Sequence, residues 1–373
     1  MKHRATLLVP LIALGVQVVP RQLFAQSERI HTHEFTTVSA VRVLRDGRVL
    51  VADRREKRLV ILGDPSADGV TVGRNGNGPL EYQVPGQLIA LGGDSTLMTD
   101  AQTGRWHLLA GASITASAPV PDALMKAVST YPLIGRDAQH RLYWLAGLPP
   151  SDPSRRVLAP GMIEEADSMV VLRRSPAGST TDTLARLKGP FGGRNMVPRV
   201  VLGVKSVYML HALLRSPDQV ALCDDGWMAV LRVDVPRVDW IRPDGRIALG
   251  ARLAVPRRPV AGRDKQQAIV EFMGERVAPY FKESEFPGWP ATVPAYAASG
   301  IHCSPRGEAL LTRFGTTSAP TLVDRVDRAG RIAGTHQLPP NATLKAATRA
   351  DLVLVVRDAD DVERLVRVPH NTP

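Results

Sequence analysis

Two Asp–Arg pairs are the first residues in this chain whose types and spacing could do chemistry. Asp53 precedes Arg58 by five residues, Asp100 precedes Arg105 by five, and the pairs lie 47 residues apart. A carboxylate held beside a guanidinium can bind a ligand or act in catalysis. A catalytic residue is not expected to recur with a repeat, so the matched spacing favours a structural role. We expect each Asp to cap the turn after its strand and to pair with its Arg across the hairpin.

Cysteine chemistry is limited to two residues, Cys223 and Cys303. Each ends an apolar strand just before a turn, in the segments CDDG and CSPRG, so they occupy equivalent positions in adjacent repeat units. A disulfide between them needs Cα atoms closer than about 7 Å. Inner strands of neighbouring units come that close only at a narrow end of a ring. A disulfide and two free thiols both stay open, and neither cysteine is expected to be a catalytic nucleophile.

Metal chemistry has only weak signals in the sequence. His31 and His33 alternate along one face of a predicted strand, where an exposed edge is favoured over a metal pair. His211, Asp218 and His302 could meet only if distant strands bring them together, so the metal ligands stay undefined. No Walker, G-x-S-x-G or H-E-x-x-H motif occurs.

The first 25 residues have the pattern of a secretory signal peptide. Lys2 and Arg4 form a basic start, residues 5–19 carry no charge, and Ala25 provides a small residue before the cut. The apolar run is shorter than the about 20 residues that span a bilayer. We therefore expect residues 1–25 to be removed on export, and the mature chain, without a transmembrane segment, to be periplasmic or extracellular. An uncleaved N-terminal anchor is the alternative.

Composition and charge describe an ordinary globular protein with a basic surface. The chain has 373 residues, of which 44% are hydrophobic and 22% are charged. Its net charge of +11 includes three basic residues of the leader, which leaves +8 after export. Basic residues stand beside acidic ones, as in the segment DRREKR at 53–58, and no basic helix or platform of stacked aromatic residues is present. We therefore expect no nucleic-acid partner.

Short strand patterns recur six times after the leader. Residues 41–62 and 88–109 align as an apolar strand, a Gly/Asp turn, an apolar strand that ends in Asp, a polar turn and a third strand. Weaker copies begin near residues 130, 218, 299 and 343. Four-stranded units at this spacing are typical of propeller blades. We predict an all-β fold, a six-bladed β-propeller of four-stranded antiparallel sheets that occupies residues 26–373.

Two insertions interrupt this rhythm. Residues 146–166, rich in Pro and Ser, predict a long loop insertion on the surface. Residues 262–282 predict one inserted surface helix, with Asp264 and Gln267 in a capping-box-like start. The apolar side of this helix should cover a rim or mouth of the ring, or shield the edge of a blade. Residues 29–35 alternate and could add an outer strand to the last unit, which would close the ring.

A glycine-rich link carries a family resemblance. Residues 73–82 read GRNGNGPLEY and are followed by Pro85 and the second unit. This segment resembles the G-R-x-G-x-G-P-G-E-F link of bacterial six-bladed propellers, which are related to NHL-repeat and TolB-like propellers. Leu80 replaces the usual Gly and Tyr82 the usual Phe, and the close match covers residues 41–110. The resemblance implies a propeller fold and an exported location, but no particular reaction.

The function predicted from these features is binding. We expect an exported, monomeric, non-catalytic binding module without a cofactor, whose partner is an unknown small molecule or an envelope protein. Ligand contacts should gather at the channel mouth where inner strands begin, a position shared by Gln87, Tyr131, Asp218, Tyr296 and Lys345. The alternative is a metal-dependent lactonase- or lyase-like propeller enzyme with a divalent cation such as calcium in the central channel. A third option is a scaffold whose inserted helix docks a membrane or an envelope partner.

Overall fold

Strands that are apolar throughout build the middle of each sheet. All five residues of β3 (Val49–Asp53) are buried. Val49 and Val51 pack toward the last sheet of the chain, whereas Leu50 and Ala52 pack toward the second sheet. Successive side chains of a strand point to opposite faces, so a strand that is apolar on both faces belongs between two neighbouring sheets.

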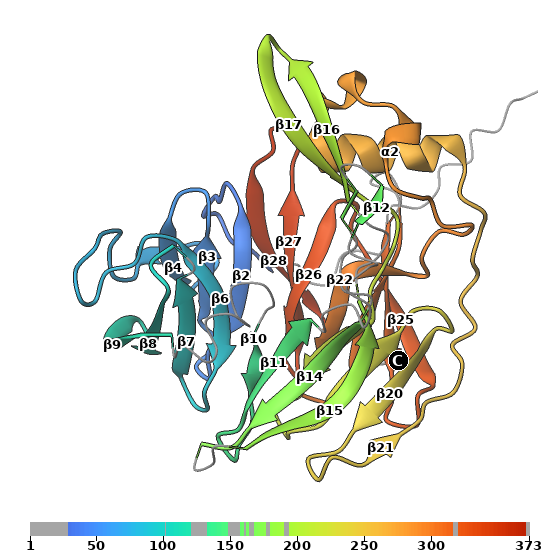
Figure 1. Cartoon of the computed structure of the whole chain (residues 1–373). Coiled ribbons are helices and arrows are strands. Elements are labelled where there is room, and N and C mark those ends of the chain that lie inside the picture. Colours follow the sequence, from blue (N-terminus) through green and yellow to red (C-terminus); the bar gives the residue numbers. More distant parts are fainter. Residues whose placement is uncertain are drawn as a thin grey trace, which may run out of the picture.

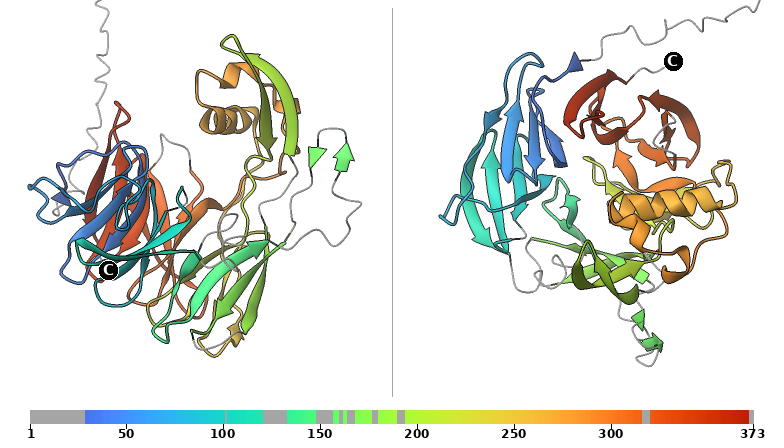
Figure 2. Two further views of the ribbon diagram at one scale, coloured as in Figure 1. Left: turned by 60° about the vertical axis from the view of Figure 1, so that its left-hand side comes forward. Right: turned by 90° about the horizontal axis from the view of Figure 1, so that it is seen from above.

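Six four-stranded antiparallel sheets of this kind form a closed ring, a six-bladed β-propeller (Figure 1, Figure 2). This computed structural model describes residues 29–100, 102–120, 133–147, 157–159, 162–163, 168–176, 180–189, 194–315 and 320–370. The first strands of neighbouring blades contact one another around the full circle. The predicted fold class is therefore confirmed.

Each blade consists of four strands that follow one another from the centre of the ring outward. Blade 1 contains β2 (Val38–Val43), β3, β4 (Arg58–Leu62) and β5 (Val70–Thr71), and blade 2 contains β6 (Pro85–Ala90), β7 (Ser95–Asp100), β8 (Arg105–Ala110) and β9 (Ser113–Pro119). Blade 3 contains β10 (Leu133–Arg136), β11 (Leu142–Gly147), β14 (Ser168–Arg174) and β15 (Thr181–Lys188). Blade 4 contains β18 (Gln219–Leu222), β19 (Met228–Arg232), β20 (Arg237–Ile241) and β21 (Ile247–Ala248), and blade 5 contains β22 (Tyr296–Cys303), β23 (Ala309–Arg313), β24 (Thr321–Val326) and β25 (Ile332–Leu338). Blade 6 contains β26 (Ala342–Ala347), β27 (Asp351–Arg357), β28 (Glu363–Pro369) and β1 (Arg29–Ile30).

The N-terminal strand closes the ring. β1 pairs antiparallel with β28, with Arg29 opposite Arg367. A backbone bridge between Phe35 and Glu363 continues this seam. The two ends of the described chain therefore share one blade, and the predicted role of residues 29–35 is confirmed.

Apolar clusters fill the interfaces between neighbouring blades. Among the described residues, one such cluster lies at each of the six junctions. At the junction of blades 4 and 5, for example, Trp240 packs in one cluster with Tyr296 and Leu311. No blade buries both of its faces alone, so the blades depend on one another for stability.

A further sheet stands outside the ring. It contains β12 (Val157–Ala159), β13 (Met162–Ile163), β16 (Arg194–Val201) and β17 (Val204–His211). Figure 2 (left) shows the β16–β17 hairpin and the helix α2 (Gly262–Met273) rising side by side from one side of the ring. Two short 3₁₀ turns, η2 (Ala278–Tyr280) and η3 (Glu283–Glu285), follow α2. We call the hairpin together with residues 258–289 the crest.

The crest corrects two expectations drawn from the sequence. The surface loop predicted over 146–166 contains the strands β12 and β13, and its residues 148–156, 160–161 and 164–166 lie outside the described part of the chain. The helix predicted within 262–282 is present, but its apolar side covers neither a mouth nor a blade edge. Ile269 of α2 instead packs in one cluster with Val201 and Leu210 of the hairpin.

The carboxylate of Asp264 caps the first turn of α2. The Asp264 carboxylate forms an ion pair with the Arg258 guanidinium. It also accepts a hydrogen bond from the Ala261 backbone N–H at 2.8 Å. Together these contacts lower the pKa of Asp264 to about 2. Gln267 takes no part in this start, because its amide donates to Glu271 one turn later. The capping contact therefore depends on Asp264 alone.

The predicted leader, residues 1–25, lies outside the described residues. Within the described residues, no helix has both the length and the apolar character needed to cross a bilayer. Cleavage and export stay predictions.

Candidate functional site

Two basic side chains on first strands join neighbouring blades. Arg42 of β2 donates to the carbonyl oxygens of Ser95 and Gly93, which joins blades 1 and 2. Lys345 of β26 donates to the Val38 carbonyl at 3.0 Å, which joins blades 6 and 1. Burial lowers the pKa of both side chains below their usual values. These two cations therefore link the first strands of neighbouring blades.

His302 on β22 lies near Lys345. Burial, followed by the nearby ammonium of Lys345, lowers the pKa of His302 to about 4. The imidazole is therefore neutral at pH 7 and adds no charge to the channel.

A disulfide joins blades 4 and 5 at one end of the channel. Cys303 is the last residue of β22, and Cys223 directly follows β18. Their Cα atoms are 5.2 Å apart and their sulfur atoms are bonded. First strands of neighbouring blades approach this closely where they end, which is the geometry that a disulfide requires. The bond ties together the two turns that follow these cysteines.

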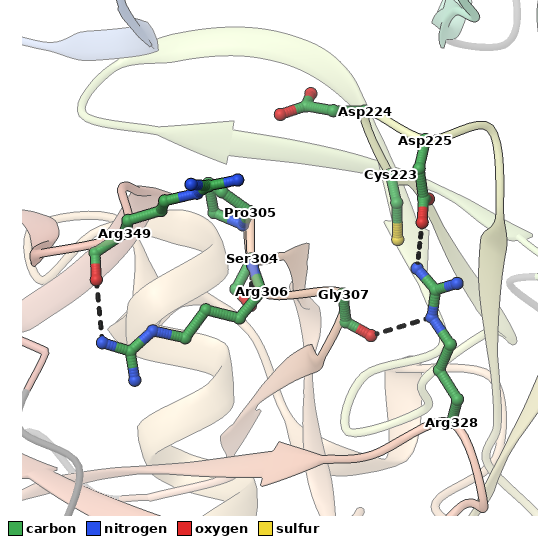
Figure 3. Close-up of a pocket in the computed structure, with 9 residues that line it drawn as sticks. All are labelled: Cys223, Asp224, Asp225, Ser304, Pro305, Arg306, Gly307, Arg328 and Arg349. Carbon is green, nitrogen blue, oxygen red and sulfur yellow. Dashed lines mark hydrogen bonds and ion pairs between the residues drawn. The ribbon is translucent and has the colours of Figure 1, made fainter.

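A pocket of about 580 Å³ opens beside this disulfide (Figure 3). It lies between turns of blades 4 and 5 and a turn of blade 6. Its lining residues are Cys223, Asp224, Asp225, Ser304, Pro305, Arg306, Gly307, Arg328 and Arg349. Three of the nine are arginines and two are aspartates, so the lining is polar and carries more positive than negative charge.

Two of the pocket arginines are held in place by the protein. Arg328 forms an ion pair with Asp225, donates from Nε to the Gly307 carbonyl at 3.2 Å and lies 4.4 Å from the centre of the Trp227 ring. Arg306 donates to the carbonyl oxygen of Arg349 at 2.8 Å. Figure 3 shows these contacts as dashed lines. The fixed guanidiniums shape the wall of the pocket rather than offering a free cation.

The side chains of Arg349 and Asp224 remain available. Both residues are exposed, and within the described part of the chain neither side chain forms a hydrogen bond or an ion pair. Figure 3 draws both side chains at the pocket without a dashed line to either charged group. An arginine without a partner can bind a carboxylate or a phosphate through two parallel hydrogen bonds.

The lining offers guanidinium and carboxylate groups that can recognise a polar ligand. It contains no His, and its one cysteine is bonded in the disulfide, so the described lining provides neither an imidazole nor a thiolate. Across the described residues, no group of three or more His, Cys, Asp or Glu side chains is placed to hold a metal ion.

The predicted mouth residues do not form one site. Asp218 is buried, pairs with Arg232 at 2.8 Å and accepts hydrogen bonds from the backbone N–H groups of Lys188 and Val233. Tyr296 is buried in the cluster between blades 4 and 5, and its hydroxyl donates to Asp324 at 3.0 Å. Both side chains are thus used within the blades and do not line a mouth.

The other predicted mouth residues have separate surroundings. Gln87 is half-buried on β6, where its backbone N–H donates to Thr99 Oγ1 at 2.9 Å. Lys345 is half-buried on β26, where its ammonium joins blades 6 and 1. Tyr131 lies outside the described residues.

The repeated Asp–Arg pairs differ in their ionic contacts. The Arg58 guanidinium lies 3.6 Å from the Asp53 carboxylate and donates to the Glu34 carbonyl. Arg105 sits opposite Asp100 in the strand register, but its Nε donates to Ser117 Oγ at 2.9 Å. The predicted ion pair is therefore present for Arg58 and wrong for Arg105, whose Nε donates to Ser117 of β9 instead.

Sequence reasoning missed the pocket residues Asp224, Arg306, Arg328 and Arg349. A usable signal was present, since Asp224 and Arg306 belong to the same turns as the two cysteines. Arg349 occupies the corresponding turn of blade 6, between β26 and β27. Extending the repeat alignment to this turn would have brought it next to the other two.

Comparison with known proteins identifies no family and no specific function for this chain. No family model and no curated protein matches the sequence. Among solved structures, the chain resembles a streptogramin B lyase with 12% identity over 93% of this chain and 87% of that one, at a TM-score of 0.42. It also resembles the calcium-binding protein regucalcin from Agrobacterium tumefaciens (11% identity, 90% and 91% coverage, TM-score 0.36). A third similar structure is an aldose sugar dehydrogenase from Streptomyces coelicolor, with 15% identity over 92% of this chain and 98% of that one, at a TM-score of 0.41. At this level of identity the likeness concerns the propeller architecture alone.

Proposed function

We propose that the chain is a non-catalytic binding module that takes a small anionic molecule into the pocket beside the Cys223–Cys303 disulfide. The observation that carries this proposal is the Arg349 guanidinium, which is exposed at the pocket and has no partner among the described residues. The neighbouring arginines are already held by protein acceptors. A ligand carboxylate or phosphate would give Arg349 the partner that it lacks.

The surroundings of the pocket favour an anion over a cation. Arg306, Arg328 and Arg349 outnumber Asp224 and Asp225 in the lining, and Asp225 is neutralised by Arg328. The chain as a whole is basic, which draws anions toward it. Asp224 would in turn accept a hydroxyl or an amino group of the same ligand, so a hydroxy acid or an amino acid fits better than a simple inorganic ion.

The family and the location of the protein are part of the proposal. The link at residues 73–82 favours kinship with the bacterial propellers related to NHL-repeat and TolB-like proteins. The leader pattern favours export to the periplasm or the extracellular space. An exported monomer with a ligand pocket fits a role in capturing small molecules outside the cytoplasm.

Ligand-dependent thermal stability tests this function. The chain from Gln26 onward would be heated with inorganic phosphate and with a panel of hydroxy acids and amino acids. A ligand that binds only the folded state raises the melting temperature. We expect at least one acid to do so, and Arg349→Ala to weaken its binding about tenfold to a hundredfold. Arg263→Ala, at an exposed arginine of α2, is the matched control and should bind like the wild type.

Failure of the proposal has a clear form. If no acid shifts the melting temperature, or if Arg349→Ala binds as tightly as Arg263→Ala, the pocket is not the site. Metal analysis of the purified protein separates the enzymatic alternative. A stoichiometric divalent cation in the channel would favour a metal-dependent lactonase- or lyase-like reaction instead.

A further inference from the structure

The outer face of the crest hairpin is apolar and exposed. Residues directly opposite each other in β16 and β17 share a face, which places Met196 and Val200 on the same side as Val207. These side chains are 41%, 55% and 57% exposed. The part of the face nearest the turn pairs Val200 with Lys205, which is also exposed.

The inner face of the same hairpin is covered. Val201 and Leu210 are buried in the cluster that contains Ile269 of α2 and Phe281. Arg199, also on this face, pairs with Glu285. The helix therefore packs against the inner face of the hairpin and leaves the outer face exposed to solvent. The outer face is thus held in position and accessible to a partner.

The turn at the end of the hairpin exposes an apolar side chain in a backbone conformation that does not favour one. Leu202 has φ 49° and Gly203 has φ 83°, with Val201 paired to Val204 across them. A two-residue turn with both φ values positive favours Asn at the first position, because a bulky side chain is strained there. Leu202 weakens the turn, yet it is 60% exposed, and Val204 beside it is 63% exposed. An apolar tip is thus present where the backbone prefers a polar residue.

Charge determines which apolar partner fits this face. Residues 194–211 contain no Asp or Glu, and among the described residues Lys205 forms no ion pair or hydrogen bond. The exposed acids Glu271 and Glu275 belong to α2 and the turn after it, which cover the inner face. An apolar tip with a neighbouring cation and no acidic residue in the hairpin matches a bilayer with anionic headgroups.

We propose that the crest hairpin docks on an anionic phospholipid surface, with Leu202 at its tip entering the boundary between headgroups and acyl chains. Lys205 then meets the lipid phosphates, and the outer face with Val200 and Val207 lies against the headgroup layer. Peripheral attachment of this kind needs no membrane-spanning segment. It would hold the ring at a membrane surface, with the ligand pocket at the opposite end of the inner strands facing away from the lipid.

Co-sedimentation with vesicles tests this proposal on the chain from Gln26 onward. Vesicles of phosphatidylcholine with about one third phosphatidylglycerol are compared with vesicles of phosphatidylcholine alone. We expect binding to the anionic vesicles that weakens as salt is raised. Leu202→Asn should lower the partition coefficient about tenfold while leaving the melting temperature unchanged or higher, because Asn suits the turn and removes apolar surface. Leu249→Asn is the matched control at a leucine that is 74% exposed outside the crest, and should bind like the wild type.

A second variant tests the outer face itself, in case Leu202→Asn acts only by changing the turn. Val200→Thr combined with Val207→Thr keeps two β-branched residues in the strands but makes the outer face polar, and should also reduce binding. Equal binding of Leu202→Asn and Leu249→Asn would overturn the proposal, as would failure of the wild type to bind anionic vesicles. A dimer in solution that Leu202→Asn dissociates would overturn it in favour of a second copy. None of these outcomes depends on Arg349, so this test and that of the pocket fail separately.

Discussion

Asp53 and Asp100 accept hydrogen bonds from backbone N–H groups at identical sequence distances. Each carboxylate binds the N–H groups of the residues 17 and 16 positions before it and of the residues two and three positions after it. The earlier pair belongs to the chain that enters the blade, and the later pair to the turn between its second and third strands. One buried carboxylate thus joins the chain entering the blade to the turn between its second and third strands, which explains why it recurs with the repeat.

Loss of one of these carboxylates should destabilise the ring. Asp53→Ala leaves four backbone N–H groups without their acceptor, and we expect the free energy of unfolding to fall by about 1–3 kcal/mol. Arg58→Ala should cost less than about 1 kcal/mol, because its guanidinium is partly exposed and 3.6 Å from the carboxylate. Urea unfolding at pH 7 measures both. Asp46→Ala, in an exposed turn, is the control, and a loss at Asp46 equal to that at Asp53 would argue against the bridging role.

Tyr296→Phe distinguishes a structural tyrosine from a mouth residue. The variant loses the bond from the hydroxyl to Asp324, which keeps its bonds to Arg313 and Thr335. We expect a loss of about 1 kcal/mol in unfolding free energy and no change in the binding of any acid that Arg349→Ala weakens. If Tyr296→Phe instead weakened ligand binding and left the unfolding free energy unchanged, Tyr296 would be a ligand-binding residue of the channel mouth.

The disulfide should stabilise both the ring and its pocket. Cys223 and Cys303 close a loop of 80 residues, and removal of a native disulfide typically costs about 2–5 kcal/mol. We expect Cys223→Ala combined with Cys303→Ala to lower the melting temperature and to weaken acid binding, because the two pocket turns are no longer tied. Reducing agent should lower the melting temperature of the wild type and leave that of the double variant unchanged. The same response in both proteins would show that the bond does not contribute.

The ring was predictable from sequence because its signals are local. Strand runs such as VLVAD at 49–53 and turns such as Asp46-Gly47 specify each hairpin without information from elsewhere in the chain. The equivalence of the cysteines required only the repeat. The β16–β17 hairpin was missed for the opposite reason. Pro198 interrupts its first strand, Leu202-Gly203 is not a common turn pair, and its apolar inner face is completed by α2 far along the chain.

The mouth residues were harder to place because the first strands are irregular. Register shifts interrupt the pairing of five of the six, among them β22 between Tyr296 and Ile301 and β26 between Leu344 and Ala346. A shift of one residue moves a side chain to the other face of a strand. Alternation alone could therefore not say that Tyr296 packs between blades 4 and 5 while Lys345 reaches the Val38 carbonyl of blade 1.

Buried histidines should make the protein sensitive to mild acid. Both ring nitrogens of His31 are buried without a hydrogen-bond partner among the described residues, and burial, followed by the charge of Arg367, lowers its pKa to about 4. Burial and the neighbouring His370 likewise lower the pKa of His336 to about 4. The expected exposed edge is thus wrong for His31, which packs into the seam that closes the ring, where its backbone N–H donates to the Leu365 carbonyl.

The direction of the pH effect follows from these lowered values. Below pH 6.5 the unfolded chain takes up protons on these histidines, whereas the folded chain does not until about pH 4. Stability is therefore full above pH 6.5 and falls as the pH drops toward 4, by roughly 2 kcal/mol at pH 5 for each of the two. Urea unfolding at pH 7.5 and pH 5.0 measures the loss before most carboxylates titrate. His31→Phe keeps a ring in the cavity and removes its titration, so the difference in unfolding free energy between the two pH values should shrink by roughly 2 kcal/mol, and the other buried histidines should account for the rest. An unchanged difference in His31→Phe would mean that His31 does not control the acid sensitivity of the seam.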